Sequence, residues 1–100
     1  MTAYETRRQA AKLFLNAASY IQKYGWQKKG MGVHGQPRCS MGALASANAQ
    51  SRWGKNLASL MYKALYEELD GMTLTQFNYK FNDGNKVAHL YKQVARSLLS

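Results

Sequence analysis

The sequence is short of acidic residues, cysteine and proline, with five Asp and Glu, one Cys and one Pro in 100 residues. A single cysteine, Cys39, cannot form an internal disulfide, which is typical of proteins in reducing compartments. The apolar runs are broken by Lys, Asn, Ser or Gln before they approach the roughly 18 residues that a membrane-spanning helix needs. The first ten residues, MTAYETRRQA, hold charges where a secretory signal peptide has its apolar segment. We therefore expect a cytoplasmic protein without a membrane span.

The shortage of acids leaves a large positive charge. Fourteen Lys and Arg residues give a formal net charge of +9 at pH 7. Residues 1–56 carry nine cations and one acid, a formal +8, whereas residues 57–100 carry five cations and four acids, a formal +1. A field of one sign raises the rate of encounter with polyanions, which include nucleic acids, acidic protein surfaces and anionic membranes.

The length predicts one domain, residues 1–100, with a single hydrophobic core. The strongest pattern runs from Tyr4 to Tyr24, where apolar residues recur at spacings of three and four and predict an amphipathic helix. Gly25 follows the last periodic residue and is expected to end this helix in a left-handed conformation.

Two helices are expected in the middle of the chain. Ser40 is expected to cap a short helix of small residues, 41–49, which we interpret as the buried central element. Ser51 is expected to open a third helix, whose apolar stripe runs from Trp53 to Leu65 and continues to Leu69.

The last third of the chain predicts one more long helix. Residues 73–81 alternate apolar and polar side chains, which fits a short strand or a short helix; we favour the helix because only part of the preceding loop could pair with a strand. Asn82 or Asp83 is expected to cap the final helix, roughly residues 85–99. The predicted fold class is all-α, a compact bundle of about four helices, with a minor β pairing as an alternative detail.

Residues 25–39 form a long loop that holds half of the glycines and the only proline. Connections in compact domains usually take about 4 to 6 residues, so this loop is either a working surface or irregular core.

Cys39, in that loop, is the candidate for covalent chemistry. It lies at an expected helix start, where backbone amides and the nearby Arg38 favour a thiolate. A nucleophile there needs a base, and His34 and His89 are the only histidines. Nothing in the spacing places them together, and a cysteine beside small helical residues is usually a packing residue. We expect a non-enzymatic protein, with a Cys39-dependent hydrolase or transferase as an alternative.

Neither a metal nor a cofactor is expected. Cys39, His34 and His89 supply three ligands without the paired spacings of structural zinc sites. Glu67 and Glu68 are adjacent on a helix and do not face each other. The loop glycines do not follow a strand, as those of phosphate-binding loops do.

The cations are the expected binding residues. An acidic protein partner is preferred, because the sequence has no helix-turn-helix or zinc-finger signature and no aromatic platform on a strand. Nucleic-acid binding through the same side chains is the alternative. Tyr62 and Tyr66, one helical turn apart, could anchor an interface or be partly buried. The expected binding face consists of Arg7, Arg8, Lys12, Lys23, Lys28, Lys29, Arg38, Lys86, Lys92 and Arg96.

Three short motifs stand in order along the chain: AASYIQKYGW at 17–26, GQPRCSMGAL at 35–44 and FND at 81–83. Together they resemble a family of small proteins of unknown function from actinobacteria and their phages. Its pattern is a helix ending in Gly-Trp, a variable loop, a Cys-x-x-Gly-Ala-Leu helix start and a Trp-Asn-Asp before the final helix; Phe81 replaces that tryptophan here. The shared positions are Gly25, Trp26, Cys39, Gly42, Leu44, Asn82 and Asp83.

The resemblance implies structural roles and no particular activity. By analogy Trp26 closes the bundle end, Gly42 lets two helices touch, and Asn82 and Asp83 cap a helix. A site where Cys39 and Asp83 meet is the alternative. A phage setting would imply a small effector that binds a host protein in the host cytoplasm.

Overall fold

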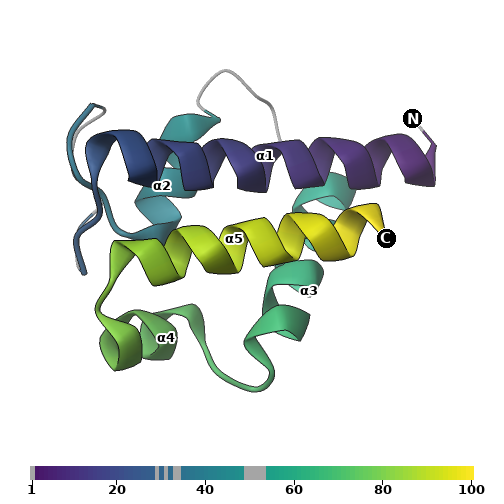
Figure 1. Ribbon diagram of the computed structural model, residues 1–100. Helices are drawn as coiled ribbons and strands as arrows, with labels where there is room; N and C mark the ends of the chain where they lie inside the picture. The colour runs from purple at the N-terminus through teal and green to yellow at the C-terminus, as the bar shows by residue number, and fades with distance from the viewer. Residues whose placement is uncertain (1, 29, 31, 33–34, 49–53) are drawn as a thin grey trace.

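The computed structural model describes residues 2–28, 30, 32, 35–48 and 54–100 (Figure 1). Within these ranges the chain forms α-helices and no β-strand, so the predicted all-α class is confirmed. The described helices number five, one more than the expected four. They are α1 (Ala3–Tyr24), α2 (Ser40–Ala47), α3 (Lys55–Leu69), α4 (Leu74–Phe81) and α5 (Gly84–Leu99). Each of them is too short or too polar to cross a membrane.

The centre of the molecule is the antiparallel pair α1 and α5, which lie side by side (Figure 1). Their apolar stripes face each other, and the rings of Phe14 and Tyr91 meet at 5.4 Å between centroids. The core residues expected on both helices are buried, except that Tyr24 is only partly so. The second helix is buried, as expected, and its buried residues include Ser40, Gly42, Ala43 and Leu44. It packs against α1 and is not the central element, which is the α1–α5 pair.

Gly25 ends α1, as expected. Its φ of +94° is a conformation that favours glycine, and its N–H donates to the carbonyl of Ile21. A Cβ at this position would also approach Cγ of Pro37 to 3.3 Å. The glycine therefore turns the chain and lets the loop fold back against the helix end.

The expected cap of α2 was off by one residue. Cys39 is the N-cap, and its Sγ accepts a hydrogen bond from the N–H of Gly42 at 3.4 Å. Ser40 is the first helical residue, and its side chain is fully buried. The helix ends at Ala47, earlier than expected, because Asn48 turns its amide Nδ2 to the carbonyls of Leu44 at 2.7 Å and Leu13 at 3.1 Å.

The third helix begins later than expected. Gly54 is the N-cap of α3, so Ser51 does not open it, and Ser51 and Trp53 lie outside the described residues. The predicted stripe from Leu57 to Leu69 is otherwise confirmed, with Leu60 partly buried.

The segment 73–81 contains a helix, as favoured. Thr73 and Gln76 form a capping box at the start of α4, in which each side chain accepts the other residue's N–H. Asn82 ends α4 at φ +47°, and Asp83 caps α5 by accepting the N–H of Asn85 at 2.9 Å. In the described part of the chain, the alternative β pairing reduces to one bridge, between Trp26 and Arg38 inside the loop.

Candidate functional site

A chain of buried hydrogen bonds centres on Ser40. The indole Nε1 of Trp26 donates to Ser40 Oγ at 3.1 Å, and that hydroxyl donates to Oδ1 of Asn78 at 2.6 Å. The hydroxyl of Tyr91 donates to the Ser40 carbonyl at 2.6 Å. These contacts join the 25–39 loop, α2, α4 and α5 at one point. Of the four residues, the sequence analysis marked Trp26 as a motif position and Ser40 as a helix cap, but it gave no sign that they share a hydrogen-bond network.

Tyr91 serves this network as a fixed donor. Its side chain is fully buried. Burial raises the pKa of the Tyr91 phenol well above its ordinary value, and the nearby Cys39 and Tyr62 act in the same direction. The phenol therefore stays protonated at neutral pH and has no acid–base role there.

Trp26 also packs closely against the start of α5. A Cβ added to Gly84, the first residue of α5, would lie 2.7 Å from Cβ of Trp26. Only a residue without a side chain lets the loop and the helix approach this closely. Trp26 is thus packed against the end of the α1–α5 pair, the position that the family resemblance implied.

A cavity of about 520 Å³ lies beside this network, between the loop, α2, α3 and α4. We call it the tyrosine cavity; its described lining includes Lys28, Cys39, Tyr62, Tyr66, Asn78 and Tyr79. The rings of Tyr62 and Tyr66 are stacked at 6.5 Å with an interplanar angle of 21°. The ammonium Nζ of Lys28 lies 4.8 Å from the ring centre of Tyr79.

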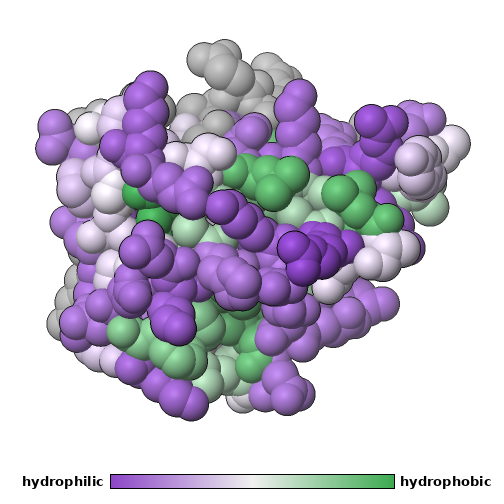
Figure 2. Space-filling view, in the orientation of Figure 1, coloured by the Kyte–Doolittle hydropathy of each residue, from purple (hydrophilic) through white to green (hydrophobic). Residues whose placement is uncertain are grey.

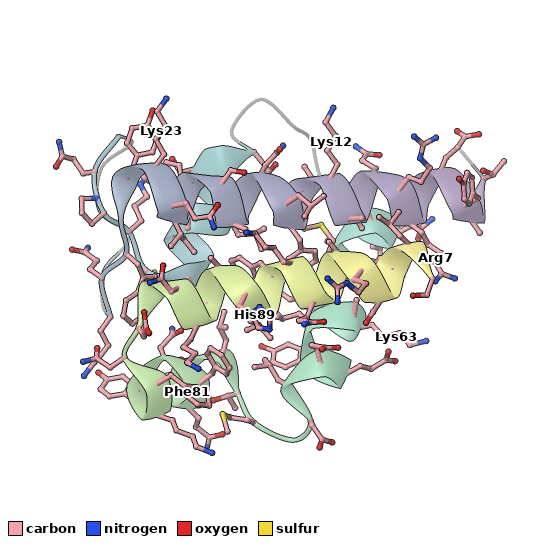
Figure 3. All side chains as sticks on the ribbon, in the orientation of Figure 1. Arg7, Lys12, Lys23, Lys63, Phe81 and His89 are labelled. Atoms are coloured by element: carbon pink, nitrogen blue, oxygen red, sulfur yellow. The ribbon has the colours of Figure 1, made fainter. Side chains whose placement is uncertain are left out.

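The parts of the hypothetical thiol site are not brought together in the described residues. His89 lies on the outer side of α5 (Figure 3), where its Nε2 is 3.1 Å from the side-chain amide nitrogen of Gln93. His34 lies outside the described residues. Asp83 caps α5 and does not line the cavity that holds Cys39. No group of three or more His, Cys, Asp or Glu in the described ranges could hold a metal ion.

Several of the predicted binding cations contact other parts of the protein or are partly buried by them. Arg7 holds the end of α5, because its Nε donates to the Leu98 carbonyl at 2.8 Å and its Nη2 to that of Ser100 at 3.1 Å (Figure 3). Arg38 is half-buried, and its Nε is enclosed without a hydrogen-bond partner among the described residues. Lys28 belongs to the tyrosine cavity, and Lys29 lies outside the described residues.

Other cations gather where α1 and α5 meet solvent. Leu15 of α1 and Leu99 of α5 are 41% and 57% exposed, and with Lys92 and Arg96 they line a groove of about 420 Å³. Arg8 lines an adjoining hollow that also contains Leu99. We call Arg8, Leu15, Lys92, Arg96 and Leu99 the α1–α5 surface. Figure 2 shows hydrophobic residues between hydrophilic ones over these two helices.

The remaining predicted cations lie around this surface. Lys12 shares a shallow hollow with Arg8, and it points away from α5 on the same side of α1 as Lys23 (Figure 3). Lys86 is exposed near the start of α5, about a third of a turn around the helix from Lys92. The nine cations of this set that the structure describes therefore do not form one continuous face.

The family motif positions cluster where the loop meets helix ends. Gly25 and Cys39 bound the loop, Trp26 packs on α5, and Asn82 and Asp83 link α4 to α5. Gly42 and Leu44 are buried in α2.

Comparisons with curated proteins and with solved structures found no match. A family model, described as a family of unknown function (DUF6197), matches residues 5–97, a range that includes all three motifs and the whole loop. The match confirms the resemblance to a family of unknown function. The chain belongs to the DUF6197 family.

Proposed function

We propose that the protein is a binding module whose α1–α5 surface docks on an acidic protein partner that also offers apolar side chains. The observation that carries this proposal is the position of Leu15 and Leu99, which stand exposed in the same groove as Lys92 and Arg96. The net charge of +9 supplies the long-range attraction.

The leucines favour a protein over a phosphate backbone. Cations alone would serve either ligand, since both carry negative charge. Burial of exposed leucine side chains stabilises a complex only if the partner covers them with apolar atoms, and a phosphate backbone has none to offer. An acidic, amphipathic helix meets both requirements, because its apolar face would cover the groove while its carboxylates reach the flanking cations.

Matched charge reversals test the proposal. Arg8→Glu/Lys92→Glu/Arg96→Glu changes the α1–α5 surface, and Lys55→Glu/Lys63→Glu/Lys80→Glu changes exposed cations on α3 and α4. Each triple lowers the formal net charge from +9 to +3. Retention of a partner from nuclease-treated native lysate should be lost in the first triple and kept in the second. Equal loss in both would show that net charge alone is responsible and would contradict the proposal.

Nucleic-acid binding is the alternative, and the line of Arg8, Lys12 and Lys23 along α1 is the observation that favours it. If that line of three cations follows a phosphate backbone, release of about three counterions should give a log–log salt slope near about −3. Titration of a labelled DNA duplex at about 50 mM salt measures this directly. Absence of binding there removes the alternative.

A further inference from the structure

We propose that the tyrosine cavity is a binding site for a planar aromatic molecule that carries a negative charge, with the ring and charge of a nucleotide. The cavity is separate from the α1–α5 surface and shares no lining residue with its groove. Its volume of about 520 Å³ falls in the range of about 300 to 1,000 Å³ typical of small-molecule sites.

The aromatic part follows from the cavity walls. Tyr62, Tyr66 and Tyr79 are 40%, 49% and 48% exposed, although each belongs to a helix that packs on the core. Tyr62 and Tyr66 present stacked rings from α3, and Tyr79 faces the same space from α4. The Tyr79 ring is in contact with Lys28. The stacked pair Tyr62 and Tyr66 is suited to stack on a flat ring, which every nucleobase offers.

The charge of the ligand follows from the polar lining. Lys28 is the one charged residue among the described residues that line the cavity, and no carboxylate is among them. Its ammonium lies against the Tyr79 ring and so occupies the position that a cationic ligand would take in an aromatic cage. Thr73, Leu74 and Thr75 at the start of α4 also line the cavity, and a helix N-terminus attracts an anion. The cavity therefore favours an anion.

Asn78 supplies a group that could select among rings. It is 8% exposed and lines the cavity, and its Oδ1 is held by the Ser40 hydroxyl. That contact fixes the orientation of the amide. Its Nδ2 has no hydrogen-bond partner among the described residues, so it is available to an acceptor atom of a bound ring.

Two sources could provide this chemistry, a free nucleotide or a base of a single-stranded nucleic acid. Titration of the purified protein with AMP, GMP, CMP and UMP, followed by NMR of the tyrosine side chains, tests whether the cavity binds a nucleotide. The affinity for a single-stranded tetranucleotide, compared with that for the mononucleotides, distinguishes the two sources. Tighter binding of the tetranucleotide by about tenfold or more assigns the polymer, and equal affinity assigns the free nucleotide.

Two variants and one control, Tyr4→Ala, locate the binding. Tyr66→Ala should weaken nucleotide binding by about tenfold or more, whereas Tyr4→Ala, an exposed tyrosine on α1, should leave it unchanged. Lys28→Gln should weaken AMP and leave adenosine, which lacks the phosphate, unaffected. Both changed residues are outside the buried core, and thermal unfolding checks that the variants fold.

No saturable binding of any of the four nucleotides up to about 5 mM would overturn the proposal. Equal weakening by Tyr66→Ala and Tyr4→Ala would do the same. The Arg8→Glu/Lys92→Glu/Arg96→Glu triple should still bind nucleotide at this site, so failure here and failure of the proposed protein docking are distinguishable.

Discussion

Ser40 connects parts of the chain that lie far apart in the sequence. Its bonds reach Trp26, Asn78 and Tyr91, at separations of 14, 38 and 51 residues. Buried polar groups are tolerated when each has a partner, and together such groups restrict the ways in which a core can pack. Ser40 is thus the residue on which the relative position of loop, α2, α4 and α5 depends.

We expect Ser40→Ala to lower the free energy of unfolding by about 2 to 4 kcal/mol, because it leaves both the Trp26 N–H and the Asn78 carbonyl without a partner. The midpoint of urea unfolding measures the change. Ser19→Ala, at an exposed position of α1, is the control and should shift stability by less than about 0.5 kcal/mol. A Ser40 variant as stable as this control would contradict the network's role.

At Gly84 we expect glycine to be more stable than alanine, the reverse of the usual preference in a helix. Alanine is normally the better helix residue by about 1 kcal/mol. Here its Cβ would meet Trp26 at 2.7 Å, so Gly84→Ala should destabilise by about 1 to 3 kcal/mol. Gly54→Ala, where a Cβ meets nothing within 4 Å, should cost less than about 1 kcal/mol, which is the cost of placing alanine at the N-cap of α3. Thermal unfolding of the two variants and the wild type measures the difference.

Tyr91 predicts a pH dependence at the alkaline end. Its pKa is raised by burial, so the unfolded chain, with a tyrosine pKa of about 10, loses the proton first. The stabilisation by the protonated phenol is complete below about pH 10 and falls as the pH rises above it. The difference in unfolding free energy between wild type and Tyr91→Phe should decrease by up to about 1.4 kcal/mol per pH unit there. Urea titrations at pH 8 and pH 11 measure it, and an unchanged difference would contradict a buried, protonated phenol.

The residue-level part of the site was the least predictable. Trp26 and Cys39 stood out because they are rare residue types in short motifs. The hydrogen bond between Ser40 and Asn78, which are 38 residues apart, could not be predicted, because it produces no periodic pattern in the sequence. The role of Gly84 could not be predicted either, because in the sequence it looks like part of an Asn-Asp-Gly turn. Its contact with Trp26 appears only once the loop returns to the start of α5.

At the scale of elements, periodicity predicted the long helices well and their ends less well. The stripes of α1, α3 and α5 are long enough to define a face, whereas the cap of α2 depends on single side chains. Ser40 looks like a cap by residue type, yet its hydroxyl is used by the network and Cys39 caps in its place. The small residues of α2 predicted close packing correctly but did not reveal that α1 and α5 form the centre.

Helix α4 is held at its start by a capping box, and its residues that line the tyrosine cavity are Leu74, Thr75, Asn78 and Tyr79. We expect Thr73→Ala to lower stability by about 1 kcal/mol, because it removes the acceptor of the Gln76 N–H. Thr73→Ser keeps the oxygen and should restore most of the loss. Denaturant unfolding compares the three proteins, and a serine variant as unstable as the alanine variant would contradict the capping role.

At the scale of the whole molecule, the sequence predicted the size of the positive charge but not its distribution. All ten cations read as solvent-exposed helix or loop positions. The fold engages Arg7 with the end of α5, half-buries Arg38 and places Lys28 in a cavity, since these contacts depend on which helices become neighbours. Leu15 and Leu99 gain their significance in the same way, because they adjoin only after α1 and α5 pair.

The most direct measurement of the proposed docking leaves every charge unchanged. Leu15→Ser/Leu99→Ser keeps the net charge at +9 and removes the apolar part of the α1–α5 surface. With the partner recovered from lysate, we expect its affinity for this variant to fall by about 10-fold to 100-fold, at about 1 kcal/mol for each partly exposed leucine. Phe81→Ser, an exposed residue on α4, should bind the partner as the wild type does. Undiminished affinity of the leucine variant would contradict the account, because only electrostatic attraction would then hold the partner.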